Sequence, residues 1–324
     1  MPRYLVTGAA GFIGARVAEQ LLQEGHTVLG LDNLNDAYDR RLKDWRLARL
    51  QGQPGFDFRP LDICDREALA SAWEPGLEAV INLAARAGVR ASVRDPWTYA
   101  RTNFEGTLNL LELCRERGPL KLVQASTSSM YGAHNPRPFR EDADTSRPLS
   151  PYTATKGAAE LLCHTYHHLY GLDVSVLRYF TVYGPAGRPD MSVFRFIQWI
   201  AEDRPVRIFG DGKQQRDFTY VEDTARGTLA ALRPAGYEII NLGGDRPWEM
   251  LEVVHQIERL LDKEARLQQL PAAPGDVPAT WADIGKAQAM LKWQPLVDLA
   301  AGLEASVRWY LEQRDWARDV DTSD

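Results

Sequence analysis

The stretch Tyr4-Leu5-Val6-Thr7-Gly8-Ala9-Ala10-Gly11-Phe12-Ile13-Gly14, close to the N-terminus, decides the fold. Its short apolar run is typical of a buried strand, and a helical pattern follows the third glycine through Leu22. Between a strand and a helix, three glycines allow a tight turn, close approach of the backbone to a pyrophosphate, and close packing of the helix on the sheet. A glycine trio alone is a weak signal, but this one has the strand–turn–helix context that dinucleotide binding requires. The residues expected to bind the dinucleotide here are Gly8, Gly11, Phe12, Ile13 and Gly14.

The second predicted strand indicates which dinucleotide is bound. This strand, over 26–31, ends in Asp32, 18 residues after Gly14. A carboxylate there binds the ribose hydroxyls of adenosine and repels a 2′-phosphate, which favours NAD over NADP. The alternative is a βαβ unit that binds no nucleotide. Further cofactor contacts are expected just after this strand, at the end of a strand over 56–63, and at the small residues ending an apolar strand over 79–85: Asn33, Asn35, Lys43, Asp62, Ile63, Leu83, Ala84 and Ala85.

The composition excludes several classes of protein. Apolar residues make up 44% of the 324 and charged residues 25%, which is the balance of a soluble globular protein with a substantial core. A net charge of −6 provides no basic field for nucleic acid or an anionic membrane. No apolar run predicts a transmembrane helix, and the N-terminus enters a strand without a signal peptide. Three scattered cysteines, Cys64, Cys114 and Cys163, predict reduced thiols in a cytoplasmic protein.

Strands and helices alternate through the first half of the chain. A helical pattern covers 107–114 and a strand covers 120–125, so we expect an α/β fold with a doubly wound parallel sheet. Open sheets of this kind bind ligands at the carboxyl ends of their strands. The strand over 120–125 ends there in the hydroxyl run Ser126-Thr127-Ser128-Ser129. Structurally, such a run can also be a turn held by local backbone bonds.

A tyrosine and a lysine stand at the start of a predicted helix in Ser150-Pro151-Tyr152-Thr153-Ala154-Thr155-Lys156. Four residues apart on a helix, Tyr152 and Lys156 project from the same face. Lys156 can then lower the pKa of the Tyr152 phenol, so that the phenol acts as a base near neutral pH. Alone, this spacing is more often an amphipathic surface pair. The glycine turn, Asp32 and the hydroxyl run favour the catalytic interpretation.

Together these motifs resemble the extended short-chain dehydrogenase/reductase family of nucleotide-sugar enzymes, in that family's order and over nearly the whole chain. The resemblance implies a Rossmann-type doubly wound parallel sheet with a smaller C-terminal α/β substrate-binding domain. The NAD-binding domain is expected over 1–180, with a later segment near 215–240 returning to it. The nucleotide-sugar domain is expected over 181–315, and 316–324 as a frayed tail. A homodimer formed through long helices is also implied.

The resemblance further implies the roles of the catalytic residues. Tyr152 is the base, Lys156 orients the nicotinamide ribose, and Thr127 hydrogen-bonds the sugar hydroxyl that is oxidised at carbon 4. Where dehydratases of the family carry an acid pair after the threonine, this chain has Ser128 and Ser129. Neither serine can act as a carboxyl acid or base, which speaks against dehydration and, less strongly, against decarboxylation. Tyr179 is a further expected cofactor contact.

The second half of the chain is similar to the subgroup of this family that interconverts UDP-glucuronate and UDP-galacturonate. In that subgroup the residues matching Thr181 and Arg188 hold the sugar carboxylate, and a guanidinium suits that task because it grips a carboxylate bidentately. The alternative for Arg188 is a surface arginine in a Gly-Pro loop. Oxidation at carbon 4 makes a β-keto acid, so we hypothesise that this clamp holds the carboxylate out of the alignment that releases carbon dioxide. The further substrate-binding residues implied by the resemblance are Arg90, Ser128, Arg207, Phe209, Arg216 and Asp276, with Ala273 where relatives often have arginine.

We therefore expect an NAD-dependent 4-epimerase of a UDP-sugar, with UDP-glucuronate as the substrate that the resemblance implies, and with no metal and no nucleic-acid or membrane partner. His164 and His168 have the spacing of a metal pair but lack a third ligand. The alternatives are a UDP-glucose/UDP-galactose 4-epimerase, a UDP-glucuronate decarboxylase and, outside enzymes, an NAD-sensing module on the same fold.

Overall fold

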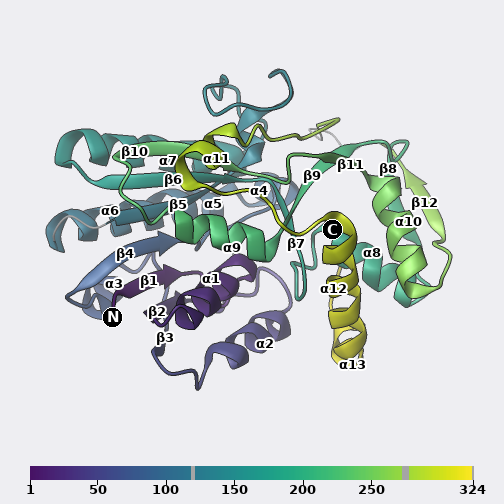
Figure 1. Ribbon diagram of the computed structural model, residues 1–324, viewed down its shortest axis with the longest axis horizontal. Helices are drawn as coiled ribbons and strands as arrows, with labels where there is room; N and C mark the ends of the chain where they lie inside the picture. Colours follow the sequence, from purple (N-terminus) through teal and green to yellow (C-terminus); the bar gives the residue numbers. More distant parts are fainter. Residues whose placement is uncertain (118–120, 272–276, 323–324) are drawn as a thin grey trace.

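The computed structural model describes residues 1–117, 121–271 and 277–322, and its main feature is a parallel sheet of seven strands (Figure 1). The strand order is β10-β6-β5-β4-β1-β2-β3. The strands are β1 (Arg3–Thr7), β2 (Thr27–Asp32), β3 (Phe56–Pro60), β4 (Leu77–Asn82), β5 (Lys121–Thr127), β6 (Asp173–Tyr179) and β10 (Tyr237–Leu242). The order reverses between β1 and β4, which is where doubly wound sheets bind ligands beyond the carboxyl ends of their strands. The predicted α/β class and doubly wound sheet are confirmed.

Helices cover both faces of this sheet, so its central strands are largely buried, and most of their residues are apolar. They are α1 (Phe12–Gln23), α2 (Arg40–Leu50), α3 (Arg66–Ala72), α4 (Val89–Arg94), α5 (Pro96–Tyr99), α6 (Gly106–Arg117), α7 (Pro151–Tyr170) and α9 (Val221–Ala230). A π-helical segment, η1 (Ala100–Glu105), leads into α6, and a 3₁₀ turn, η2 (Ser128–Tyr131), follows β5. Among the described residues, no helix is long and apolar enough to cross a membrane.

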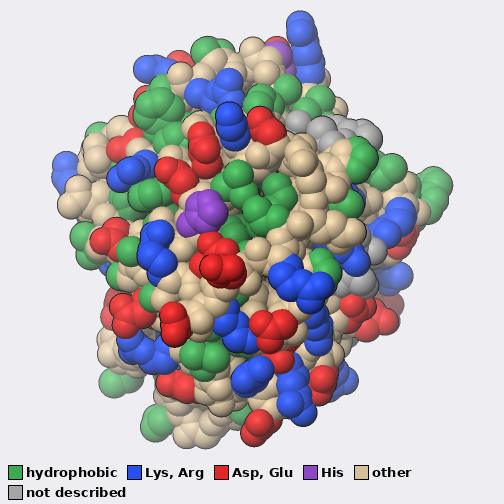
Figure 2. Space-filling view, turned by 90° about the vertical axis from the view of Figure 1, so that its right-hand side faces the viewer, with side chains coloured by type: hydrophobic (Ala, Val, Ile, Leu, Met, Phe, Trp, Pro, Cys, Tyr) green, Lys and Arg blue, Asp and Glu red, His purple; other side chains and the backbone are tan. Residues whose placement is uncertain are grey.

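A smaller group of elements packs beside the sheet, on the right of Figure 1. Its strands are β7 (Thr181–Tyr183), β9 (Gln215–Tyr220) and β11 (Pro247–Glu249) in one sheet, and β8 (Val206–Phe209) and β12 (Leu267–Leu270) in another. Its helices are α8 (Ser192–Ala201), α10 (Met250–Leu261), α12 (Leu299–Glu312) and α13 (Arg314–Ala317), while α11 (Gly285–Leu291) lies against β10. On the face drawn in Figure 2, cationic and anionic side chains are interspersed.

The glycine turn has the strained, close-packed geometry that requires glycine. Gly8 has φ +69°, and a Cβ there would lie 2.8 Å from the Ala84 nitrogen. A Cβ on Gly14 would lie 2.0 Å from the Gly8 carbonyl oxygen. The turn therefore presses α1 against β1 and brings its backbone to the end of β4.

Several predicted boundaries differ from the structure. The strand expected over 79–85 ends at Asn82, because the Asn82 side chain accepts a hydrogen bond from Thr7 Oγ1 (2.7 Å) and donates one to Gln124 Oε1 (2.9 Å). These two hydrogen bonds join the ends of β1, β4 and β5. The small residues 83–85, which follow β4, therefore lie outside the hydrogen-bonded sheet. The strand expected to begin at residue 120 begins at Lys121, and residue 120 lies outside the described residues.

The segment 215–240 divides between the two parts of the molecule. β9 joins the small sheet, whereas α9 packs on α1 and β10 extends the large sheet beside β6. The division of the chain into domains near residue 180 stays a prediction.

The prediction of a frayed tail over 316–324 is wrong for its described part. Gln198 Nε2 donates to the Val320 carbonyl (2.8 Å), and Trp199 Nε1 donates to Thr322 Oγ1 (3.0 Å). Val320 is buried against α8 and α12. The side chains of Gln198 and Trp199 on α8 thus hold a C-terminal segment in place, although its polar composition alone predicts exposure to solvent.

Candidate active site

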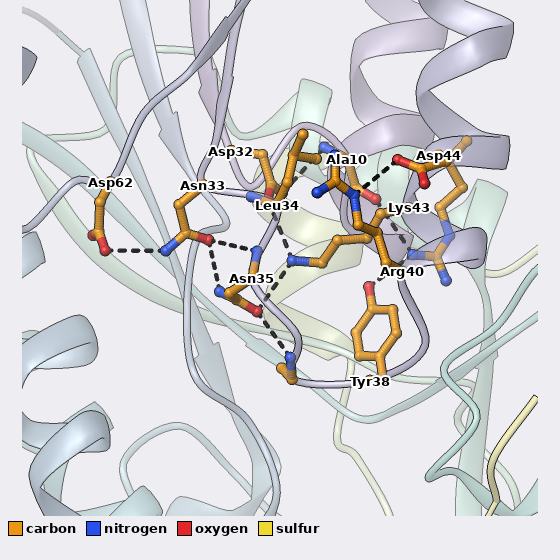
Figure 3. Close-up of polar contacts among 12 residues, drawn as sticks. Ala10, Asp32, Asn33, Leu34, Asn35, Tyr38, Arg40, Lys43, Asp44 and Asp62 are labelled. Carbon is orange, nitrogen blue, oxygen red and sulfur yellow. Dashed lines mark hydrogen bonds and ion pairs between the residues drawn. The ribbon is translucent and has the colours of Figure 1, made fainter.

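Asp32 is fixed at the end of β2, beside the glycine turn (Figure 3). Its carboxylate accepts the backbone N–H of Ala10 (3.2 Å) and of Leu34 (2.8 Å), and Lys43 Nζ lies 3.3 Å from Oδ1. The aspartate and the lysine are both buried. A carboxylate has about four acceptor positions, so this one is held in place and keeps capacity for ribose hydroxyls.

The other residues expected to contact the adenosine end form one polar network (Figure 3). Asn33 Nδ2 donates to Asp62 Oδ2 (3.0 Å), and Asn35 Nδ2 donates to Asn33 Oδ1 (2.6 Å). Lys43 Nζ also donates to Asn35 Oδ1 (3.2 Å). The residue after Asp62, Ile63, is buried in the core with its carbonyl bound by Asn109. The network joins the ends of β2 and β3.

The small residues after β4 lie against the glycine turn. Ala84 donates its N–H to Thr7 Oγ1 (3.1 Å), and the nearest atoms to an added Cβ on Gly8 belong to Leu83 and Ala84. Leu83, Ala84 and Ala85 are half-buried. In the turn, Phe12 and Gly14 are buried and Gly11 and Ile13 half-buried. The ends of β1 and β4 thus form one continuous backbone surface.

Tyr179 stands apart from the other expected cofactor residues. It ends β6, and its phenol hydrogen-bonds Thr228 Oγ1 of α9 (2.8 Å) in the core. Burial raises the pKa of this phenol. Its hydroxyl is therefore engaged within the protein.

Thr127 and Tyr152 meet at the end of β5. Ser150 caps α7 by accepting the Thr153 N–H (3.2 Å), which places Tyr152 and Lys156 in the first two turns of the helix. The Thr127 hydroxyl faces the Tyr152 phenol and lowers the pKa of that phenol. It also donates to Ser129 Oγ (3.2 Å) in η2, and Ser128 and Ser129 are both half-buried.

Burial changes the acidity of both helix residues. It raises the pKa of the Tyr152 phenol, against the lowering effects of the hydrogen bond with Thr127 and the nearby charge of Arg188. The expected lowering of this pKa by Lys156 is thus not found in the chain without cofactor. Burial lowers the pKa of Lys156 to about 8, while the charge of Glu160 opposes that shift. Glu160 itself forms an ion pair with Arg178 (2.7 Å).

The residues present fit NAD. Lys156 is 3% exposed, and in the part of the chain that the structure describes its ammonium has no hydrogen-bond acceptor, so a bound ribose would supply what the protein does not. The glycine turn offers close backbone approach at the N-terminus of α1, and Asp32 offers a fixed carboxylate. These three features lie at the carboxyl edge of the same sheet.

The expected sugar clamp lies beyond β6. Thr181 and Arg188 line one cavity together with Tyr183, Gly187, Met191 and Phe218. Arg188 donates through Nε to Asp190 Oδ1 (3.0 Å), pairs through Nη2 with Asp190 Oδ2, and donates to the Ala87 carbonyl (3.3 Å). Asp190 therefore occupies the Nε edge of the guanidinium. This partner of Arg188 was not predicted from the sequence.

The expected nucleotide-binding residues are brought partly together. The Arg90 guanidinium of α4 lies 4.2 Å from the centre of the Phe209 ring on β8, and Arg207 is exposed on the same strand. Arg216 pairs with Trp248 in the β9–β11 ladder. Asp276 and Ala273 lie outside the described residues.

Three further residues lie near the site: Glu160 and Tyr99, which no sequence pattern indicated, and Arg46, which stands near the expected cofactor contact Lys43 in the basic segment after Asp32. Arg46 and Glu160 are buried polar residues on α2 and α7, and Tyr99 packs edge-on against Tyr152 with ring centres 6.1 Å apart. Their contacts join segments far apart in the chain, so no local spacing reveals them. The discounted His164 packs on Tyr237, and within the described residues no group of side chains could hold a metal ion.

Comparison with known proteins agrees with this geometry. The model of the NAD dependent epimerase/dehydratase family matches residues 4–243. A UDP-glucuronate 4-epimerase of Thermodesulfobacterium geofontis is 56% identical over 322 residues, covering 99% of both chains. The crystal structure of UDP-glucuronic acid 4-epimerase from Bacillus cereus, in complex with UDP-glucuronic acid and NAD, is 39% identical with a TM-score of 0.90, covering 96% of this chain and 99% of that one. A UDP-glucose 4-epimerase from Thermotoga maritima with UDP-glucose is 31% identical with a TM-score of 0.88, covering 96% and 99%. The chain therefore belongs to the NAD dependent epimerase/dehydratase family.

Proposed function

We propose that this protein is an NAD-dependent 4-epimerase that interconverts UDP-glucuronate and UDP-galacturonate. The observation that carries the proposal is the position of Arg188, which lines the cavity of Thr181 and donates to the Ala87 carbonyl. That carbonyl also accepts the hydroxyl of Tyr99, whose ring packs edge-on against Tyr152. A guanidinium this close to a base that serves carbon 4 suits a sugar with a carboxylate on carbon 5. The 56% identity to a UDP-glucuronate 4-epimerase supports the same substrate.

The chain's own residues would handle the proton. Tyr152 takes the proton of the 4-hydroxyl, and Thr127, whose hydroxyl faces the phenol, orients that sugar hydroxyl. When bound, NAD supplies the hydride acceptor for carbon 4 and later the hydride donor. Lys156 lies one turn after Tyr152 and holds the nicotinamide ribose, where its positive charge favours the phenolate. The keto sugar then presents its opposite face, and Tyr152 returns the proton.

The surroundings of Thr127 favour epimerisation over elimination. Ser128 and Ser129 follow it in η2, and neither provides a carboxyl group for acid–base chemistry at carbon 5 or carbon 6. Thr181 and Arg188 would hold the sugar carboxylate in the plane that retains carbon dioxide. The keto intermediate then survives until it is reduced.

Epimerisation of a neutral sugar between UDP-glucose and UDP-galactose is the second candidate. Asp190 pairs with the guanidinium of Arg188 in this structure, and a neutral sugar would leave that pair undisturbed. The two candidates differ in whether the cavity receives a carboxylate.

We also propose a cytoplasmic homodimer. Among the described residues, large apolar side chains are exposed on α4, α5 and α7, which lie against one another: Val93, Trp97, Leu161, Leu169 and Tyr170. Such exposed apolar side chains favour a protein contact. The three cysteines are free and buried, in keeping with a reducing compartment.

The test incubates the purified protein separately with UDP-glucuronate and UDP-glucose and identifies the products by NMR. We expect UDP-galacturonate from the first and little change in the second. Tyr152→Phe should lower turnover by about 10²-fold or more, since it removes the acid–base group. Tyr170→Phe, on the exposed end of the same helix, is the matched control. Turnover of UDP-glucose alone would refute the uronate substrate, and a UDP-pentose as main product would identify a decarboxylase.

A further inference from the structure

Arg46 is a buried arginine of α2 that the proposed mechanism does not use. Its side chain lies between the glycine turn and the loop that leads to Arg188, and only 3% of it is exposed. Within the described residues it forms no ion pair, and all its acceptors are carbonyl or hydroxyl oxygens. Burying a charge without a carboxylate partner costs solvation free energy. The hydrogen bonds of Arg46 must therefore offset that cost.

Each N–H of this guanidinium has an acceptor. Nε and Nη2 donate to the Ala186 carbonyl at 3.0 and 2.6 Å, and Nη2 also donates to the Gly187 carbonyl at 3.3 Å. Nη1 donates to the Tyr38 hydroxyl (2.7 Å) and to the Ala10 carbonyl (3.3 Å). An arginine has five such donors in a rigid fork, so the side chain has one position that satisfies all of them.

The loop held in this way is strained. Ala186 has φ +53°, a left-handed conformation that a residue with a Cβ rarely adopts. Such a conformation persists only where the surroundings hold it, and the two bonds from Arg46 to the Ala186 carbonyl do so. Arg188 follows two residues later, with its side chain in the cavity of Thr181.

The other end of the guanidinium contacts the cofactor turn. The Ala10 peptide donates its N–H to Asp32 (3.2 Å; Figure 3), and its carbonyl accepts a hydrogen bond from Arg46 Nη1 (3.3 Å). One side chain therefore fixes the loop of Arg188 relative to the turn beside Asp32. A sugar carboxylate gripped by Arg188 is thereby placed in the same frame as the cofactor.

We propose that Arg46 is a positioning residue for the sugar carboxylate: it holds the 185–188 loop in its strained form, so that Arg188 faces the sugar and the site prefers UDP-glucuronate to UDP-glucose. The inference rests on the proposed function. It assigns Arg46 no contact with the substrate. A lysine at this position keeps the charge but lacks the fork, so it cannot hold Ala186, Gly187 and Ala10 together.

The experiment compares binding in protein loaded with NAD and made inactive by Tyr152→Phe, so that turnover does not disturb calorimetry. We expect Arg46→Lys to lower the ratio of affinities for UDP-glucuronate and UDP-glucose by about tenfold, mainly by weakening UDP-glucuronate. Arg188→Ala should abolish the preference. Arg49→Lys is the matched control, because Arg49 lies one turn later on the same helix, exposed and paired with Glu19. Tyr38→Phe removes one acceptor of Arg46 and should give a smaller loss in the same direction.

Hydrogen exchange gives a readout that depends on no substrate. Amides of 184–191 should exchange faster in Arg46→Lys than in Arg49→Lys, while those of β4 and β5 stay protected. Unchanged exchange of this loop, or an unchanged affinity ratio in both Arg46→Lys and Tyr38→Phe, would overturn the inference. An equal loss of affinity for both UDP-sugars, together with loss of bound NAD, would also overturn the inference, because Arg46 would then support only the glycine turn that binds the cofactor. If the NAD-loaded Tyr152→Phe protein itself showed no preference for UDP-glucuronate, the proposed function would be refuted. Arg46 would then have no carboxylate-binding residues to position.

Discussion

Lys156 is a buried cation whose pKa is lowered to about 8 by desolvation, against an ordinary value of 10.5. Between these two values the unfolded chain keeps the proton and the folded chain loses it, so the free energy of unfolding rises with pH. In the cofactor-free protein we expect the difference in unfolding free energy between wild type and Lys156→Met to change by about 2 kcal/mol, in favour of wild type, from pH 7.5 to pH 10. Urea unfolding at several pH values measures it.

The control for this prediction is Lys213→Met, since Lys213 is exposed on the loop before β9. Its stability relative to wild type should not change over the same pH range. A parallel pH profile for Lys156→Met and wild type would contradict the prediction, because the buried lysine would then keep its proton as readily as in the unfolded chain.

At the scale of elements, the first turn of α7 couples stability to catalysis. Ser150 caps the helix through the Thr153 N–H, and Tyr152 stands in the same turn. Ser150→Ala should lower the free energy of unfolding by about 1 kcal/mol, and the fraying turn should lower kcat several-fold. Denaturant unfolding and NMR turnover assays measure the two effects.

Asp298→Ala is the matched control for the cap. Asp298 caps α12 by accepting the Ala301 N–H at 2.8 Å, on a helix that carries none of the residues proposed for catalysis. We expect a similar loss of stability with kcat unchanged. Equal effects of both variants on kcat would show that the loss reflects general destabilisation rather than the position of Tyr152.

The sequence predicted those elements and site residues whose signal is local. The glycine turn, Asp32 and the pair of Tyr152 and Lys156 have fixed spacings along the chain, so strand and helix geometry alone place them. The end of β4 was missed, because it depends on side-chain bonds of Asn82 to two other strands.

Residues whose partners are distant in sequence gave no such signal. Arg46 stands in the basic segment after Asp32, from which the sequence suggests a contact with the cofactor, but its partner Ala186 lies 140 positions away. Asp190 is only two residues from Arg188, but nothing in the sequence says that their side chains turn toward each other. Likewise Thr322 anchors the C-terminal segment through Trp199, across 123 positions. These contacts depend on tertiary packing, which leaves no local pattern in a single sequence.

At the scale of the whole molecule, the exposed face of α7 predicts the assembly. Leu161 and Leu169 are 71% and 59% exposed, and at eight residues apart they lie about 80° from each other around the helix, within one broad face. η1 packs beside α7 and adds Phe104, which is partly exposed. A second copy related by a two-fold axis would cover this surface with the same surface, as in most homo-oligomers.

We expect Leu161→Arg to convert the proposed dimer into a monomer, because it places a charge within this apolar surface. Sedimentation velocity at micromolar concentrations measures the change. Leu311→Arg is the matched control, since Leu311 is 48% exposed on α12, away from α7, and should leave the dimer intact. Because Tyr152 and Lys156 lie on the helix that forms this surface, the monomer should also bind NAD less tightly. A wild-type protein that sediments as a monomer would contradict the proposed dimer. A dimer that persists in Leu161→Arg would show that the contact lies on another surface.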